Sequence, residues 1–364
     1  MSETHVCIHA HFYQPPRENP WLEEVEPEPS AAPYHDWNER ITAECYAPNG
    51  AARITDANGR IKAIRNNYAS ISFNFGPTLL GWMELKAPAT YAAILEADAE
   101  SVERFDGHGS ALAQPYNHMI MPLATARDRR TQVAWGVADF RRRFGRDPEG
   151  MWLPETAVDL DTLEALAEGG VRFTVLAPHQ AARVRSPGGE WHDVGPEGPD
   201  TAISYRQALP SGRVMSLFFY DGPTSRAVAF EKLLDDGETL ATRLMGIARS
   251  RDEAGGGLVH IATDGETYGH HHGHGDMALA VALGRIEREP GVRLSNYALY
   301  LAAHPPEHEV QILEATAWSC AHGVERWRSD CGCSTGGEAD WNLSLIHISE
   351  PTRPPLLSRM TSSA

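Results

Sequence analysis

The sequence predicts an α/β protein whose parallel strands form a barrel with helices on the outside. Short apolar segments that read as buried strands alternate with longer segments that have the apolar spacing of helices. A chain of 364 residues can bury a large core of this kind. Two of the apolar segments lead into the carboxylates Glu155 and Asp264. Side chains at the carboxyl ends of parallel strands gather around one cavity, so we expect these two acids to lie close together.

Strand and helix signals follow one another along most of the chain. Strands are expected at residues 5–12, 71–75, 150–153, 173–177, 214–220 and 258–263. Helices are expected at 88–103, 127–144, 161–168, 230–250 and 276–289. Asp161 and Glu164 have the spacing of a capping box at the start of the third helix. The Pro- and Gly-rich segments 21–38 and 186–201 are interpreted as insertions, because strand signals resume after each, and the number of βα units favours a barrel over an open sheet.

Composition and charge exclude several classes of partner. The formal net charge of −17 argues against nucleic acid, since phosphate binding needs a basic face. No apolar run approaches the length of a membrane helix, and the N-terminus lacks a secretory leader. The sparse, odd set of cysteines shows no disulfide framework: Cys7, Cys45, Cys320, Cys331 and Cys333. We therefore expect a cytoplasmic protein without nucleic-acid or membrane partners; the sequence gives no signal for its oligomeric state.

The C-terminal end has a different texture from the rest of the chain. From Leu343 it reads LSLIHISEPTRPPLLSRMTSSA, and residues 344–354 resemble translated sequencing-adapter read-through. We interpret residues 343–364 as a non-native tail and expect the natural protein to be longer. The predicted organisation is a catalytic barrel over residues 1–300, the truncated start of a C-terminal region over 301–342, and the tail.

Two segments carry side chains suited to recognising hydroxyl groups. His9 and His11 alternate along the first strand, which places them on the same face. Two such histidines can bind sugar hydroxyls or a metal, or form a structural pair. The segment 114–122 adds Gln114 and His118 before a helix, again with amide and imidazole groups.

The two acidic segments carry the reactive groups. Trp152 precedes Glu155, and its indole offers a flat apolar face for a sugar ring. Glu155 could act as a nucleophile that forms a covalent glycosyl ester. Asp264 precedes Gly265, which permits a sharp turn, and could serve as general acid and then base if burial or a neighbouring carboxylate raises its pKa. Glu266 is the rival for that role, and both acids could instead be capping or salt-bridging residues.

Together these segments resemble glycoside hydrolase family 57, which is known by five short regions in a fixed order. The first matching region contains His9, His11 and Gln14. The others follow in order: Gln114 to Pro122, Gly150 to Glu155, Thr263 to Gly269, and Trp318 to Trp327. The resemblance covers residues 5 to 330. It implies an incomplete (β/α)7 barrel with helical additions, a retaining mechanism on α-glucans or related α-glycosides, and no metal or other cofactor.

The resemblance also implies residue roles. It makes Glu155 the nucleophile and Asp264 the acid/base. Substrate-binding positions are expected at His9, His11, Gln14, Gln114, His118, Trp152, Glu266, Tyr268 and Trp318. The chain departs from the family where Thr267 and Tyr268 stand in place of the Lys-Phe of many members, and a histidine run, His270 to His274, follows.

Two other classes of function remain open at the level of sequence. His9, His11, Asp264 and the histidines of 270–274 could bind a divalent metal, as in polysaccharide deacetylases on a similar incomplete barrel. The histidine run could equally be a solvated loop. A non-catalytic glycan-binding protein is the third reading.

Overall fold

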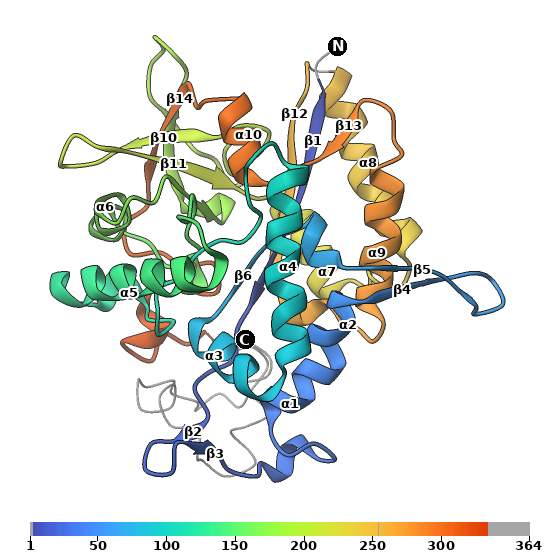
Figure 1. The fold of residues 1–364 in the computed structure, drawn as a ribbon. Helices are drawn as coiled ribbons and strands as arrows, with labels where there is room; N and C mark the ends of the chain where they lie inside the picture. Colours follow the sequence, from blue (N-terminus) through green and yellow to red (C-terminus); the bar gives the residue numbers. More distant parts are fainter. Residues whose placement is uncertain (1–2, 254, 334–364) are drawn as a thin grey trace.

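The computed structural model describes residues 3–253 and 255–333 of the chain, which form a mixed α/β fold (Figure 1). At its centre lies β1 (Thr4–Phe12), every residue of which is buried. This near-continuous apolar strand is typical of a parallel sheet that is covered on both faces. The interpreted tail, residues 343–364, lies outside the described residues. Within the part that is described, no helix is both long and apolar enough to cross a membrane.

A parallel array of strands positions the chemistry-bearing side chains. β1 pairs with β12 (Gly257–Asp264) on one side, and with β6 (Ser72–Phe75) and β13 (Val292–Leu294) on the other. In this register His11 lies opposite both Asp264 and Asn74. The carboxyl ends of these strands are therefore level with one another, as expected for adjacent parallel strands.

The array continues through short bridges rather than full strands. Parallel bridges join Phe73 to Ala111, Ala113 to Met151, and Gly150 to Phe173. The predicted strand at 150–153 is thus reduced to bridge contacts at its first residues. A side chain at Gly150 would meet the Phe173 ring at 2.3 Å, so only glycine fits there. From β7 (Phe173–Leu176) the array passes to β11 (Val214–Phe219), and Asp221 N beyond β11 donates to His260 O of β12.

The same β7 and β11 belong to a second, mixed sheet. It continues through β10 (Tyr205–Ala208), β14 (His308–Ile312), β8 (Ala181–Arg185) and β9 (His192–Asp193). The predicted insertion 186–201 therefore contains β9, which pairs with β8. β14 follows α10 (Tyr297–Ala303) and pairs with β10 and β8, so residues beyond 300 contribute strands to this sheet.

Helices pack against the parallel array, as Figure 1 shows for α4, α7, α8 and α9. The described helices of seven or more residues, besides α10, are α3 (Pro77–Lys86), α4 (Pro88–Arg104), α5 (Ala126–Phe144), α6 (Leu160–Glu168), α7 (Gly222–Phe230), α8 (Gly237–Glu253) and α9 (Gly275–Ile286). Four of the five predicted helices are confirmed within a few residues. The expected single helix 230–250 is wrong: Phe230 ends α7, and Asp236 accepts from Thr239 N at the start of α8.

The cap of α6 also differs from the prediction. Asp159 is the capping residue and accepts from Thr162 N at 2.7 Å. Asp161 instead pairs with Arg129, and Glu164 pairs with Arg213. The two side chains that the capping-box spacing assigned to the helix start form ion pairs instead, because the capping residue lies two positions earlier, at Asp159.

The long connection between β1 and β6 contributes to the site from the outside. It contains a two-stranded ribbon, β2 (Glu18–Asn19) with β3 (Glu24–Val25), of which β3 falls within the predicted insertion 21–38. Two short helices, α1 (Trp37–Ile41) and α2 (Ala47–Gly50), flank a π-helical turn at Thr42–Tyr46. The hairpin β4 (Ala52–Thr55) with β5 (Ile61–Arg65) follows. The π-helical turn carries Tyr46, whose hydroxyl reaches the carboxyl ends of the parallel strands.

Candidate active site

Glu155 occupies a strained turn directly after the Gly150–Met151 bridges. Its φ is 57°, and that of Thr156 is 49°, so two adjacent non-glycine residues adopt the left-handed region. Such backbone is costly for a β-branched residue and persists only where the surroundings enforce it. Here Gln180 enforces it: the Thr156 hydroxyl donates to Gln180 Oε1, and Gln180 Nε2 donates to Thr156 O, both at 2.8 Å. The turn therefore fixes the direction of the Glu155 side chain.

The Glu155 carboxylate is oriented by two donors on one oxygen. Oε2 accepts from Trp318 Nε1 at 2.9 Å and from Ser319 Oγ at 2.5 Å. Trp318 N also donates to Glu155 O, which ties the two segments together through their backbones. Two hydrogen bonds to one oxygen hold the Glu155 carboxylate in one rotamer, and no partner of Oε1 is found among the described residues.

Asp264 ends β12 and faces the same group of acids. Among the described residues no hydrogen bond is made to its carboxyl group, and the side chain is half-buried. Burial, followed by the negative charges of Glu266 and Glu155, holds the pKa of Asp264 well above its usual range. The raised pKa favours the protonated form of Asp264, which can donate a proton.

Glu266 is held by fixed donors and is less free than Asp264. Its Oε1 accepts from Tyr13 N at 3.1 Å and from the Tyr46 hydroxyl at 2.5 Å. Burial raises the pKa of Glu266 to about 7, while these hydrogen bonds oppose the rise. Gly265 separates the two acids, and a side chain there would meet the Phe12 ring at 2.2 Å. The chain turns here, as predicted, into the helical turn 265–268, and the close packing against Phe12 rather than a positive φ is what requires glycine.

His9, His11 and Trp152 form a buried stack behind the acids. The His9 ring lies 4.6 Å from the Trp152 ring at 22°, and the His11 ring lies 5.3 Å from it at the same angle. Trp152 and His9 are both 0% exposed. The expectation that Trp152 presents a face to a sugar is therefore wrong in this structure, because the two imidazoles lie against the indole.

A chain of hydrogen bonds fixes the tautomers of these histidines. Burial lowers the pKa of both His9 and His11 to about 3, so both are neutral near pH 7. Asn74 Nδ2 donates to His11 Nδ1 at 2.9 Å, which leaves the proton of neutral His11 on Nε2. His11 Nε2 then donates to His118 Nε2 at 3.1 Å. These bonds fix which ring nitrogen of His11 donates and which accepts, and His11 lies opposite Asp264 in the strand register.

The remaining predicted binding residues divide into two groups. Gln114 is buried, its Oε1 accepts from Asn74 Nδ2, and its Nε2 has no partner among the described residues. His118 stacks on Tyr13 with ring centroids 3.6 Å apart. Gln14 is half-buried and accepts from Arg17. Tyr268, in contrast, is fully buried in the hydrophobic core, so its predicted contact with substrate is wrong in this structure.

Sequence reasoning missed several residues that shape this site. Asn74 links both histidines, Gln180 fixes the turn at Glu155, and Ser319 donates to its carboxylate. Tyr220 is a further one, since burial and then the charge of Asp264 raise the pKa of its hydroxyl group. Asn74 had a signal, since it sits near the end of a predicted strand. Ser319 had one too, since it directly follows Trp318 in the predicted fifth region, whereas Gln180 had none because it acts on Glu155 from a distant segment.

The histidine run does not join His9, His11 and Asp264 in a metal site. His270 Nδ1 pairs with Glu44 at 2.5 Å, and His272 Nε2 donates to Ala229 O. Within residues 3–253 and 255–333, the group of side chains that could hold a metal lies elsewhere and includes none of these residues. The deacetylase-like alternative is therefore not supported. The run is a loop tied to its neighbours.

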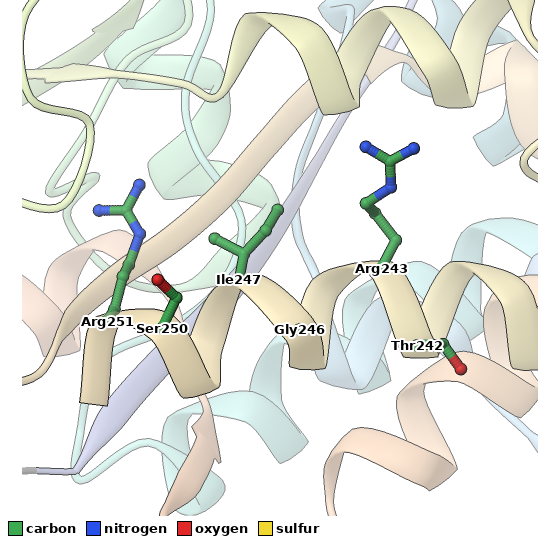
Figure 2. Close-up of a pocket in the computed structure, with 6 residues that line it drawn as sticks. All are labelled: Thr242, Arg243, Gly246, Ile247, Ser250 and Arg251. Carbon is green, nitrogen blue, oxygen red and sulfur yellow. The ribbon is translucent and has the colours of Figure 1, made fainter. Parts of the chain in front are cut away.

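A shallow hollow is found away from these acids, on the exposed face of α8 (Figure 2). The residues that line it all belong to that one helix: Thr242, Arg243, Gly246, Ile247, Ser250 and Arg251. It contains no carboxylate and is part of the outer surface, so it does not compete with the strand-end acids as a reaction centre.

The fold of the chain is similar to that of several solved structures. The chain resembles a 4-α-glucanotransferase from Thermococcus litoralis (16% identity, TM-score 0.63, covering 90% of this chain and 44% of that one). It also resembles a branching enzyme from Thermococcus kodakaraensis (15% identity, TM-score 0.61, 95% and 78%). An α-amylase from Thermotoga maritima is similar as well (12% identity, TM-score 0.58, 87% and 78%). These likenesses show a shared fold.

The chain spans about half the length of the first of these structures and of an exo-type maltose-forming amylase from Pyrococcus, where it covers 56%. No curated protein matches the sequence. The model of glycosyl hydrolase family 57 matches residues 61–312, which is more than half of the chain and includes both Glu155 and Asp264. The chain therefore belongs to glycosyl hydrolase family 57.

Proposed function

We propose that this chain is a retaining glycoside hydrolase or transglycosidase that acts on α-glucans or related α-glycosides. Glu155 is the nucleophile and Asp264 the general acid/base. The observation that carries the proposal is the pairing of a rigidly oriented Glu155 with an Asp264 whose pKa is raised partly by the charge of Glu155. The substrate class rests on family membership and on similar structures named as a 4-α-glucanotransferase, a branching enzyme and an α-amylase.

The fold of the proposed enzyme is an incomplete (β/α)7 barrel. Its support is the parallel array that runs from β12 through β1 and β6 to β7 and β11. Among the described residues no strand pairing joins β11 to β12, and the link between them is the bond from Asp221 N to His260 O. This arrangement accounts for the acids' shared location, because both follow strands of one array.

In the first step, Glu155 Oε1 attacks the anomeric carbon while protonated Asp264 gives its proton to the glycosidic oxygen. The bond from the anomeric carbon to that oxygen breaks, and a glycosyl ester of Glu155 forms. Trp318 and Ser319 keep their bonds to Oε2, which leaves Oε1 as the attacking oxygen. Their positions limit rotation of the carboxylate during attack.

Formation of the ester also prepares the second step. Glu155 loses its negative charge, and with it one of the causes that raise the pKa of Asp264. Asp264 then ionises more readily and acts as the base. It takes a proton from water, or from the hydroxyl of a second sugar, as that oxygen attacks the anomeric carbon and releases Glu155. The catalytic groups of both steps are the Glu155 and Asp264 side chains, so the proposed mechanism requires no cofactor.

The neutral imidazoles and amides around the acids suit a polyhydroxylated substrate. His118 and Gln14 lie at the half-buried edge of the site, and the free Nε2 of Gln114 is a further donor. In our proposal these groups bind sugar hydroxyls, while buried His9 and His11 hold Asn74 and His118 in place through hydrogen bonds. Binding by neutral groups fits an uncharged glucan.

Product analysis tests this proposal. Purified protein is incubated with maltooligosaccharides, amylose and glycogen, and the anomeric configuration of the first-formed product is followed by NMR. We expect α-configured products, with water, a glucan or a branch point as acceptor. Inverted β-configured products would refute the double displacement. Binding of these glucans without turnover would indicate a glycan-binding protein and overturn the proposal.

A further inference from the structure

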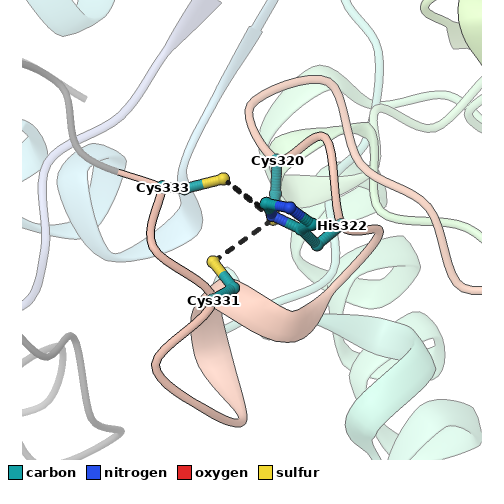
Figure 3. Close-up of side chains that lie close together, drawn as sticks. All are labelled: Cys320, His322, Cys331 and Cys333. Atoms are coloured by element: carbon teal, nitrogen blue, oxygen red, sulfur yellow. Dashed lines mark hydrogen bonds between the residues drawn. The ribbon is translucent and has the colours of Figure 1, made fainter.

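Three cysteines and a histidine of the short segment 320–333 come together near the C-terminal end of the described chain (Figure 3). Cys320 is buried, Cys331 and Cys333 are half-buried, and His322 is exposed. Their ligand atoms all lie within 4.8 Å of one another. The sequence shows the five cysteines as a sparse set without a framework, whereas the structure brings these three together, because the loop after His322 folds back on Cys320.

The separations match those around a tetrahedral zinc ion. Cys320 Sγ lies 3.8 Å from Cys331 Sγ and 3.7 Å from Cys333 Sγ, and His322 Nδ1 lies 3.3 Å from Cys333 Sγ. With Zn–S near 2.3 Å and Zn–N near 2.0–2.1 Å, a tetrahedron places two sulfurs about 3.8 Å apart and sulfur from nitrogen about 3.6 Å apart. All three cysteines have free thiols.

We propose that Cys320, His322, Cys331 and Cys333 bind one structural zinc ion. Three thiolates and one imidazole form a closed tetrahedral set, which leaves no position for substrate and is typical of structural rather than catalytic zinc. The set contains no carboxylate, so it does not suit magnesium or calcium. Gly332 has a φ of 71°, and this turn lets the two flanking thiols face the same point.

The zinc ion would stabilise a segment that has little regular structure of its own. After β14 the described chain contains one short helical turn, at Glu325–Trp327. Its apolar contacts form a small cluster of Ala157, Ala317, Cys320, Val324 and Trp327. Binding one ion at both ends of the 320–333 loop closes that loop and contributes folding free energy that this small core lacks.

This segment also holds Glu155. Trp318 and Ser319, which donate to Glu155 Oε2, directly precede the ligand Cys320. Thr316 pairs with Val158 on the far side of the same turn. The ion would therefore act as an anchor for the donors that orient the proposed nucleophile. This positioning role rests on the proposed function, whereas the binding of zinc does not.

Metal analysis decides whether the site exists. Tag-free protein is purified under reducing conditions, and its zinc content is measured by mass spectrometry for wild type, Cys331→Ser and a control, Cys7→Ala, at a buried thiol outside the cluster. We expect one zinc per chain in wild type and control, and none in Cys331→Ser. Protein that holds no zinc and takes up none when zinc is added would overturn the proposal. So would an intramolecular disulfide between two of the cluster cysteines.

Cobalt substitution keeps the test valid if Cys331→Ser does not fold. Wild-type protein loaded with Co²⁺ should show thiolate-to-cobalt charge transfer and the intense visible bands of a tetrahedral site. His322→Ala should alter these bands, while His192→Ala, at an exposed histidine of β9, should not. Octahedral, weakly absorbing cobalt would contradict the proposed ligand set.

The anchoring role is tested by removing the ion from folded protein with a chelator. Proteolysis within residues 313–333 should become faster, and kcat should fall by about tenfold or more as the donors to Glu155 are lost. Restored zinc should reverse both effects. If zinc is present but its removal changes neither, the anchor is refuted. If the protein turns over no glucan at all, zinc content and proteolysis still report on this site separately from the proposed function.

Discussion

Replacing Gln180 with alanine should weaken catalysis far more than its distance from the chemistry suggests. Gln180 is fully buried, and its side chain holds both sides of the turn at Glu155. Oε1 accepts from Thr156 Oγ1 and Ala177 N, each at 2.8 Å. Nε2 donates to Thr156 O at 2.8 Å and to Thr316 Oγ1 at 3.2 Å. Gln180→Ala removes all four hydrogen bonds at once.

The expected loss of stability follows from these contacts. Three buried groups lose their partner, Thr156 Oγ1, Thr156 O and Ala177 N, whereas Thr316 Oγ1 keeps its bond to Leu313 O. Each such group costs about 1–3 kcal/mol, so three groups in the lower half of that range cost about 4 kcal/mol. The left-handed residues Glu155 and Thr156 each store about 1–3 kcal/mol of strain, and part of it is released when the turn relaxes. We therefore expect the free energy of unfolding to fall by about 2–4 kcal/mol. The same relaxation moves the Glu155 carboxylate, and a displacement near 1 Å can cost about 100-fold in rate.

Gln207→Ala is the matched control. Gln207 is also a buried glutamine, but its two side-chain bonds, to Ile312 N and Ala208 O, lie in the mixed sheet away from Glu155. Denaturant unfolding and initial rates on maltoheptaose are measured for both variants at a temperature where each remains folded. Gln180→Ala should lose about 100-fold in kcat with little change in KM, while Gln207→Ala keeps kcat. Equal kcat values for the two variants would refute the positioning argument.

Four further predictions concern the acids themselves. Glu155→Gln should abolish turnover with the fold intact by circular dichroism, because an amide cannot form the ester; activity within about tenfold of wild type, or an equal loss in Glu197→Gln at an exposed position, would contradict the nucleophile assignment. Asp264→Ala should regain activity with azide or with substrates that carry good leaving groups, and rescue of Glu266→Ala alone would reverse the assignment of the acid. Glu266 has a pKa of about 7 in the folded protein against 4.5 in a free chain, so the folded state binds more protons between these pH values. The free energy of unfolding should therefore fall by about 3 kcal/mol as the pH rises through this range. Glu266→Gln should remove this pH dependence in denaturant titrations at pH 5 and 8, and an unchanged dependence would exclude the buried carboxyl group as its source. In a crystal structure with a bound inhibitor, the carboxyl groups of Glu155 and Asp264 should lie about 5–5.5 Å apart, whereas a separation of about 6.5–9.5 Å would indicate inversion.

Much of the secondary structure was predictable because the local pattern and the tertiary environment agree. The strands at 5–12 and 258–263 are apolar runs, and the parallel array buries both of them on either face. The helix at 127–144 is confirmed as α5, which ends on Gly145 in the left-handed region. The predicted helix 230–250 is wrong because helical spacing alone cannot detect the break that Asp236 makes by capping a new helix.

The roles of individual side chains were less predictable. Trp152 was expected to face a sugar, but the fold places His9 and His11 against its ring. Tyr268 follows the acids in sequence, yet the tight turn of 265–268 directs it into the core. In both cases the residue type is compatible with either environment, and only the packing of neighbouring strands decides between them.

The sequence by itself determined the family, the α/β class and the two acids, because these depend on short segments whose chemistry and spacing are local. Strand register decided which side chains lie side by side, since it places His11 level with Asp264 and Asn74. Tertiary contacts decided how each acid is tuned, since Glu266 is held by Tyr46, far away in the chain, while Asp264 has no such partner among the described residues. They also brought Cys320 together with Cys331 and Cys333 beside the donors to Glu155. The bonds from Tyr46 to Glu266 and from Trp318 to Glu155 join residues more than 100 positions apart in the sequence. The apolar periodicity of strands and helices repeats every two to four residues and carries no information about such contacts.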